Sequence, residues 1–118
     1  IYSMIDSGKE KIYCAAYEME ASKEKLKQAL RRDLFIGVNG ISTFVKKPKE
    51  LEMFDQIPLS KILIETDAPF LAPKGERGKP NQPAFSKLIV EDLAKKRGIS
   101  TEEAAKITSE NSEKLFNI

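Results

Sequence analysis

The sequence contains no histidine and no tryptophan, and its single cysteine is Cys14. One cysteine excludes an internal disulfide framework and a thiolate zinc cluster, and it fits a reducing compartment such as the cytoplasm. Histidine is the usual general base near neutral pH and the commonest nitrogen ligand of transition metals. The chain alone therefore cannot form a Ser-His-Asp triad or a histidine metal cage.

The chain also lacks an excess of one charge and a long apolar run. It has 20 Lys and Arg against 18 Asp and Glu, a balance too even to indicate a nucleic-acid or lipid partner by itself. No apolar run approaches the roughly 20 residues that a membrane-spanning helix needs, so we expect a soluble protein with no membrane partner. A length of 118 residues fits one domain. Because the chain starts at Ile1 without an initiator Met or a signal segment, we expect a processed, truncated or excised piece.

Short apolar runs and amphipathic segments alternate along the chain. The apolar runs predict buried strands at residues 12–17, 34–39 and 61–65. Amphipathic spacing and capping signals predict helices at residues 22–32, 48–54 and 84–97, a further helix that opens with a capping box at Ser100, and a short terminal turn at residues 111–116. Ser22 is the candidate N-cap of the first helix.

This alternation is typical of right-handed β-α-β crossovers in an α/β fold with a parallel sheet. Parallel sheets are covered on both faces, and their edge strands are protected. Here the first and third predicted strands would each present an open apolar edge, with nothing in the sequence to cover it. We therefore expect that part of the fold lies outside this chain.

Several polar residues follow the third predicted strand. Glu65 and Asp67 stand at its carboxyl end, where α/β folds place their active sites, and a carboxylate there can ligate a divalent cation or orient a water molecule. The alternative is that Asp67 only caps its own turn. In the long loop that comes next, Arg77, Lys79 and Asn81 could contact phosphate oxygens, or they could be solvated turn residues.

The ends of the other predicted strands carry weaker signals. Tyr17, Glu18 and Glu20 offer a phenol and two carboxylates, which are most simply solvated groups. Residues 39–43 offer an amide, two hydroxyls and Gly40, which we interpret as a tight-turn glycine. Cys14 lies within an apolar run, so core packing is favoured over nucleophilic catalysis.

Residues 59–73 read Leu-Ser-Lys-Ile-Leu-Ile-Glu-Thr-Asp-Ala-Pro-Phe-Leu-Ala-Pro, and Arg77-Gly78-Lys79 and Asn81 follow. This combination resembles the C-terminal signature of the TatD family of metal-dependent deoxyribonucleases. The resemblance covers nearly the whole chain from about Ile12. It implies a (β/α)8 TIM barrel of the amidohydrolase type, in which this chain supplies the parallel strands six to eight. Residues 1–118 would then be the C-terminal part of a single domain whose N-terminal part is absent.

The resemblance also implies a chemistry. Members of the family hold divalent metals, here Mg²⁺, Mn²⁺ or Zn²⁺, at the carboxyl end of the barrel and hydrolyse phosphodiester bonds in DNA. Only Asp67 matches one of the family's metal ligands, so Asp67 would be the catalytic metal ligand. Glu65 would support it, and Arg77 and Asn81 would belong to the substrate loop.

One family ligand position is changed. Tyr17 stands where the family usually has a histidine at the end of the sixth strand, and a neutral phenol is a poor substitute for imidazole. The alternative is that Glu18 or Glu20 compensates with oxygen ligands.

Three hypotheses follow. The first is that the chain is the C-terminal portion of a TatD-type hydrolase and is inactive when isolated from the rest of the domain. The second is a non-catalytic interaction module or degenerate barrel fragment, which buries its open strand edges against the missing N-terminal part or another copy. The third is a metal-dependent hydrolase of C–N bonds, because a fold does not fix a function.

Overall fold

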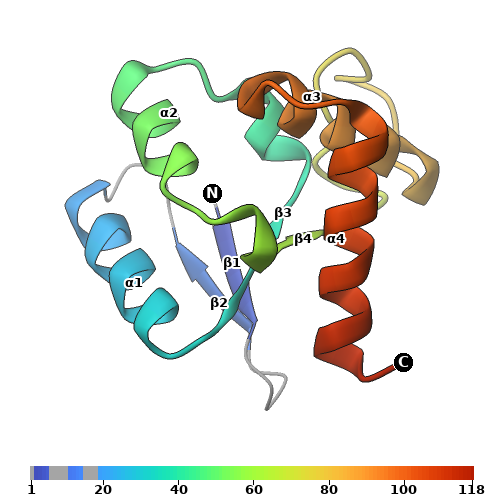
Figure 1. Cartoon of the computed structure of the whole chain (residues 1–118). Coiled ribbons are helices and arrows are strands. Elements are labelled where there is room, and N and C mark those ends of the chain that lie inside the picture. Colours follow the sequence, from blue (N-terminus) through green and yellow to red (C-terminus); the bar gives the residue numbers. More distant parts are fainter. Residues whose placement is uncertain (1, 6–10, 15–18) are drawn as a thin grey trace.

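The structure, a computed structural model, describes residues 2–5, 11–14 and 19–118 (Figure 1). The helices and strands follow one another as β1 (Tyr2–Ile5), β2 (Lys11–Cys14), α1 (Met19–Arg31), β3 (Phe35–Val38), the 3-10 helix η1 (Gly40–Phe44), α2 (Pro48–Asp55), the 3-10 helix η2 (Leu59–Lys61), β4 (Ile62–Ile64), the 3-10 helix η3 (Pro83–Phe85), α3 (Ser86–Arg97) and α4 (Thr101–Phe116). Strands and helices alternate through most of this order, which is that of an α/β fold. In the described part of the chain, no helix is long and apolar enough to cross a membrane.

Among the residues that the structure describes, four strands form one sheet in the order β2-β1-β3-β4. Strands β3 and β4 are parallel, with Ile36 opposite Ile62 and Val38 opposite Ile64, which confirms the parallel pairing predicted for these two strands. The predicted strand at residues 12–17 is present as β2, although residues 15–17 lie outside the described part. Strands β2 and β4 form the two edges of the sheet, as expected for the first and third predicted strands.

The prediction of an all-parallel sheet is wrong at β1. This strand was not predicted, and it runs antiparallel to both of its neighbours, β2 and β3. Only residues 6–10 connect β1 to β2. Such a connection is too short for the crossover of a dozen or more residues that parallel strands require, so the pair must be antiparallel.

A hydrophobic core lies between the sheet and helices α1, α2 and α3 (Figure 1). The strand register places Ile36, Val38 and Ile62 on the same face of the sheet, and all three are fully buried. Buried apolar side chains of the three helices and their connections complete the core: Leu26, Ala29, Leu34, Met53, Phe54, Ile57, Ile89 and Leu93. This packing holds β3 and β4 side by side, so that their carboxyl ends meet at one edge of the sheet.

The predicted helices are present, and two of them, α1 and α3, begin at other residues than predicted. Helix α1 begins at Met19 rather than after Ser22, which lies inside it, because the turn before Ser22 is already helical. Helix α3 begins at Ser86, since η3 occupies the preceding residues, and it ends at Gly98 in the left-handed conformation, as predicted. Ser100 caps α4 by accepting a hydrogen bond from the Glu103 amide.

The separate turn predicted at residues 111–116 is wrong, because α4 continues unbroken through it. Asn111 is buried in the middle of this helix, where its Nδ2 donates to the carbonyl oxygens of Leu59 and Ile62, each at 2.8 Å. Its amide therefore joins the last helix to the beginning of β4 instead of ending the helix.

We predict that Asn111→Ala destabilises the chain by about 2 kcal/mol, because the buried Ile62 carbonyl and the partly buried Leu59 carbonyl lose their donor. Urea unfolding measures this difference. Ser109→Ala, at an exposed position of the same helix, is the matched control and should stay within about 0.5 kcal/mol of the parent chain. Equal stability losses in the two variants would contradict this role of Asn111.

Candidate functional site

Asp67 and Asn39 come together at the carboxyl edge of the sheet. Asn39 directly follows β3, and Asp67 lies shortly after β4. Asn39 Nδ2 donates a hydrogen bond of 2.9 Å to Asp67 Oδ2, although the two residues are 28 positions apart in the sequence. The contact exists because parallel strands bring their carboxyl ends to the same side. It fixes one oxygen of the carboxylate at the place where α/β folds carry their active sites.

The amide of Asn39 is held in one orientation. Its Oδ1 accepts a hydrogen bond of 3.0 Å from the Ile41 amide, which makes Asn39 the N-cap of η1. Because Oδ1 faces a backbone donor, Nδ2 is the atom that must face Asp67. Asn39 is 4% exposed, so this orientation is set inside the protein. The sequence interpretation of residues 39–43 noted this amide but did not connect it with Asp67.

Asp67 is not the side chain that caps its own turn. That role belongs to Thr66, whose Oγ1 accepts a hydrogen bond of 3.1 Å from the Ala68 amide. Asp67 takes part in the turn only through its backbone carbonyl, which accepts from the Phe70 amide at 2.8 Å. The carboxylate is therefore available for a role beyond local turn formation.

Asn81 ties the loop after β4 together. Its side-chain Nδ2 donates to Thr66 Oγ1 at 3.1 Å and to the Phe70 carbonyl at 2.8 Å. Its backbone N–H donates to the Pro69 carbonyl at 2.9 Å. Asn81 is 5% exposed. Its amide thus shapes the loop that carries Asp67, whereas a contact of Asn81 with substrate stays a prediction.

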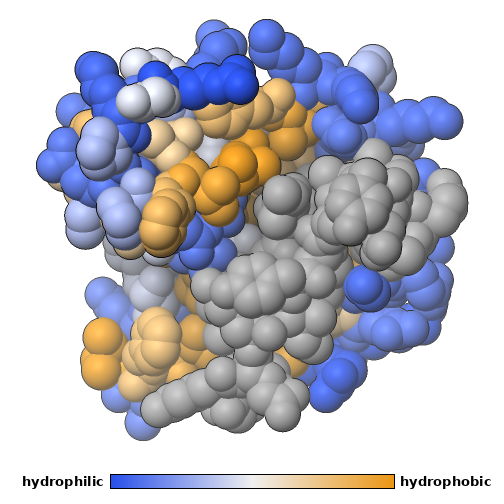
Figure 2. Space-filling view, turned by 180° about the vertical axis from the view of Figure 1, so that it is seen from behind, coloured by the Kyte–Doolittle hydropathy of each residue, from blue (hydrophilic) through white to orange (hydrophobic). Residues whose placement is uncertain are grey.

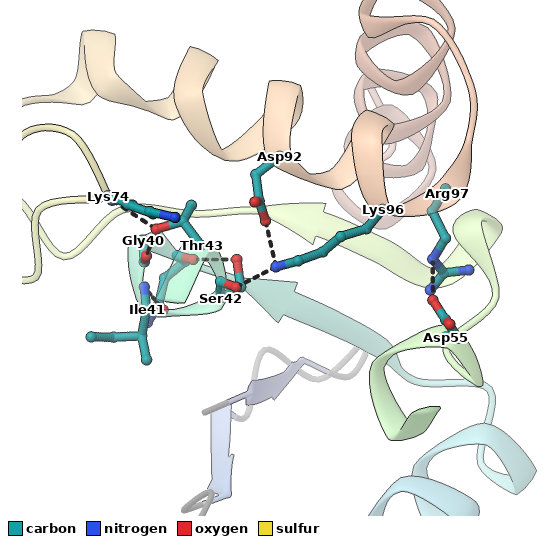
Figure 3. Close-up of polar contacts among 10 residues, drawn as sticks. Gly40, Ile41, Ser42, Thr43, Asp55, Lys74, Asp92, Lys96 and Arg97 are labelled. Atoms are coloured by element: carbon teal, nitrogen blue, oxygen red, sulfur yellow. Dashed lines mark hydrogen bonds and ion pairs between the residues drawn. The ribbon is translucent and has the colours of Figure 1, made fainter. Parts of the chain in front are cut away.

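Gly40 allows this loop to approach η1 closely. A Cβ atom at residue 40 would lie 2.4 Å from the Leu71 carbonyl oxygen and 3.0 Å from the Pro73 nitrogen. Thr43 reinforces the contact, because its Oγ1 donates to the Gly40 carbonyl at 2.6 Å and accepts from the Lys74 amide at 2.8 Å (Figure 3). Gly40 stands in a tight 3-10 turn, as predicted, because the Ser42 amide donates to the Asn39 carbonyl at 3.0 Å. Its φ angle is not positive, so the close approach of the loop, rather than the turn conformation, is what requires glycine here.

Lys96 of helix α3 also holds η1 in place. Its ammonium group donates to the Ser42 carbonyl and to Asp92 Oδ2, each at 2.6 Å, and its side chain is only 14% exposed (Figure 3). Helix α3 therefore holds the segment that contains Asn39 in place. The contacts of Thr43, Lys96 and Asn81 restrain η1 and the loop. The Asn39–Asp67 pair is therefore held in one position before any ligand binds.

A cavity of about 500 Å³ lies between the same two segments. Its lining residues are Ile41 and Phe44 of η1 and Leu71, Ala72, Arg77, Gly78 and Lys79 of the loop. Figure 2 shows hydrophobic surface bordered by hydrophilic residues in the upper part of the molecule, where the loop lies in Figure 1. The structure thus brings the predicted Arg77 to this cavity.

Glu65 lies directly after β4, where its backbone N–H donates to the Val38 carbonyl at 3.0 Å.

The described residues do not complete a metal site. None of their His, Cys, Asp and Glu side chains form a group of three that could hold a metal ion. Asp67 offers one carboxylate, and within the described part of the chain only Asn39 donates to it. Tyr17, Glu18 and the side chain of Glu20 lie outside the description, so the histidine replacement and its compensation stay predictions.

The sequence profile of the TatD-related DNases matches residues 4–117. The chain belongs to the TatD family. A metal-dependent hydrolase of Bacillus subtilis, YabD, whose function is uncharacterised, is 34% identical over 96% of this chain and 44% of its own length. The 3'-5' ssDNA/RNA exonuclease TatD of Citrobacter rodentium is 36% identical over 82% of this chain and 39% of its own length. The chain thus spans less than half the length of these TatD relatives.

Solved structures show the same relationship. The TatD homologue YJJV of Escherichia coli K12 is 28% identical, with a TM-score of 0.71 over 81% of this chain and 37% of that structure. A TatD family hydrolase of Entamoeba histolytica, at 24% identity and a TM-score of 0.65, shares the fold. The parallel pair β3 and β4 with its helices is therefore part of a TatD TIM-barrel architecture.

We predict that Gly40→Ala destabilises the chain by about 1–3 kcal/mol, because the new methyl group displaces the Leu71 carbonyl. It should also increase hydrogen exchange at the Lys74 amide, which donates to Thr43. Gly78→Ala is the control. Residue 78 has open space around it and a φ of +88°, so this variant should cost about 1 kcal/mol of strain and leave the Lys74 amide protected. Unchanged protection of Lys74 in Gly40→Ala would contradict the close-packing role.

Proposed function

We propose that this chain forms the Asp67 side of the active site of a TatD-type metal-dependent nuclease. In the complete domain β3 and β4 would be the neighbouring strands seven and eight of the barrel, and β2, which β1 separates from β3 in this structure, would be strand six. The observation that carries the proposal is the contact between Asn39 and Asp67 at the carboxyl edge of two parallel strands. The Citrobacter relative is a 3'-5' ssDNA/RNA exonuclease, which favours phosphodiester bonds of nucleic acid, DNA included, over C–N bonds as the target.

Asp67 is the proposed catalytic residue and the one metal ligand that this chain supplies. Asn39 bonds Oδ2, so the carboxylate can offer its other oxygen to a divalent cation. Mg²⁺, Mn²⁺ and Zn²⁺ are the proposed cofactors, and such an ion supplies Lewis-acid chemistry for phosphoryl transfer when it is bound. Glu65 is proposed to support the end of β4 beside Asp67. The proposed location is the cytoplasm, because a chain with a single cysteine, Cys14, fits a reducing compartment.

The isolated chain should have no nuclease activity. A catalytic metal site needs about three protein ligands, and one carboxylate cannot supply them. The test is incubation of the purified chain with single-stranded DNA and Mg²⁺, Mn²⁺ or Zn²⁺. Metal-dependent cleavage that disappears in Asp67→Ala would overturn this expectation.

A chimera tests the positive part of the proposal. Residues 4–117 replace the matching segment of YJJV, so that the rest of the domain comes from the relative. We predict that Asp67→Asn lowers the nuclease rate of an active chimera at least about 100-fold, because the amide cannot replace an anionic ligand.

Asp33→Asn is the matched control for the chimera. Asp33 has a side chain that is 85% exposed, and it precedes β3, at the opposite end of the strand from Asn39. Asparagine also tolerates the positive φ of residue 33. The control should keep the parental rate. Full activity of the Asp67→Asn chimera would contradict the proposal.

The sheet edges support a second candidate function, that of an interaction module. Strands β2 and β4 form the two edges of the sheet, and edge strands pair readily with further strands. The proposed partner is the N-terminal part of the barrel, or another copy of this chain in its absence. Native mass spectrometry tests this candidate, and a strictly monomeric chain that does not bind the N-terminal part of YJJV would rule it out.

A further inference from the structure

Asn39 and Gly40 form the dipeptide in which an asparagine side chain is chemically least stable. Of the asparagines in the chain, at positions 39, 81, 111 and 117, only Asn39 precedes a glycine. The backbone nitrogen of the glycine can attack the asparagine Cγ atom, because glycine has no side chain that would hinder the approach. Asparagine is accordingly one of the thermolabile residues that hyperthermophilic proteins use less often. The reactive asparagine of this chain is therefore the one that contacts Asp67.

The fold requires both residues of this reactive pair. The side chain at residue 39 has to donate to Asp67 and to accept from the Ile41 amide, and an asparagine amide does both. Residue 40 has to be glycine, since a Cβ atom there would lie 2.4 Å from the Leu71 carbonyl oxygen. Two separate structural demands thus place the Asn-Gly pair in the candidate site.

We propose that Asn39 is a site of spontaneous deamidation, and that its contact with Asp67 keeps the reaction slow in the folded chain. In this reaction the Gly40 nitrogen loses its proton and forms a bond to Cγ of Asn39. The bond between Cγ and Nδ2 breaks, and ammonia leaves. Water then opens the resulting succinimide ring at either carbonyl, which leaves aspartate or isoaspartate at residue 39. Metal, nucleic acid and turnover play no part in this reaction.

The folded site opposes this reaction in three ways. Ring closure turns Cγ of Asn39 onto the Gly40 nitrogen, and this rotation pulls Nδ2 away from Asp67, to which it donates at 2.9 Å. The Asn39 carbonyl belongs to the same peptide group as the Gly40 nitrogen, and it accepts from the amide and the hydroxyl of Ser42 at 3.0 and 2.8 Å. Asn39 is only 4% exposed, which limits the access of water. The reaction therefore requires a local opening of η1.

The product no longer supports Asp67. An aspartate at residue 39 presents a second carboxylate oxygen where Nδ2 donated, and an ionised carboxylate has no hydrogen to donate. The two like charges would repel each other at this short distance. Isoaspartate also routes the backbone through the former side chain and so lengthens the main chain at the start of η1. Deamidation thus removes the contact between residues 39 and 67 irreversibly.

Peptide mapping by mass spectrometry measures the deamidation rate at residue 39 in the full chain, incubated at physiological temperature and pH. We expect the folded chain to react at least about tenfold more slowly than the same chain in concentrated urea. Asp67→Ala should accelerate the reaction of the folded chain about tenfold or more, because a hydrogen bond to a charged group shifts a local equilibrium by at least about that factor. Asp67→Asn keeps the size of the side chain but removes its charge, so it should accelerate the reaction severalfold and serves as the test if Asp67→Ala does not fold.

Two variants are the matched controls. Asn111→Ala removes hydrogen bonds at the beginning of β4, the end of the strand opposite Asp67, and so weakens the fold away from the site. Glu52→Ala removes a carboxylate from an exposed position of α2. Each should change the deamidation rate of the folded chain less than about twofold, since the opening that exposes Asn39 is local.

Three results would each overturn the proposal: equal deamidation rates in the folded and the unfolded chain, no acceleration in the Asp67 variants, or equal acceleration in Asn111→Ala and Asp67→Ala. Asn39→Asp reproduces one product of the reaction, and we expect it to unfold at a lower urea concentration than the parent chain. An unchanged unfolding midpoint would show that the modified residue still supports Asp67, and it would overturn the stated consequence of deamidation.

Discussion

The hydrogen bond between Asn39 and Asp67 is the contact on which the candidate site depends. It joins the ends of two parallel strands, and it holds one carboxylate oxygen while leaving the other to a ligand. The strength of this arrangement comes from charge, since a hydrogen bond to an ionised group contributes more than one between neutral groups. The core beneath β3 and β4 keeps the two strand ends in register, so packing and polar chemistry are linked.

Other contacts serve the same two segments. Gly40 and Thr43 join η1 to the loop, Lys96 holds η1 from α3, and Asn81 closes the loop around Thr66. Each of these polar groups is at least largely buried, where a lost partner is costly. The cavity walls and the carboxylate are therefore fixed before any ligand arrives, which is how binding sites limit the entropy cost of association.

The sequence allowed part of this to be predicted, for identifiable reasons. The signature around Asp67 is continuous along the chain, so it predicted the family, the strand β4 and the carboxylate together. The role of Asn39 could not be predicted, because its partner lies 28 residues away and only the strand register unites them. The packing role of Gly40 was missed for the same reason. Strand β1 was missed because four residues carry little periodicity, and its pairing depends on neighbours rather than on its own pattern.

The most direct test of the central claim is a double-mutant cycle of Asn39→Ala and Asp67→Ala, measured by urea unfolding of the chain. If the two side chains hold each other as described, the free energies of the single variants should not add. We predict a coupling energy of about 1–3 kcal/mol, the range of a partly buried hydrogen bond to a charged group. A coupling energy within about 0.3 kcal/mol of zero would show that Asn39 does not position Asp67, and it would contradict the account.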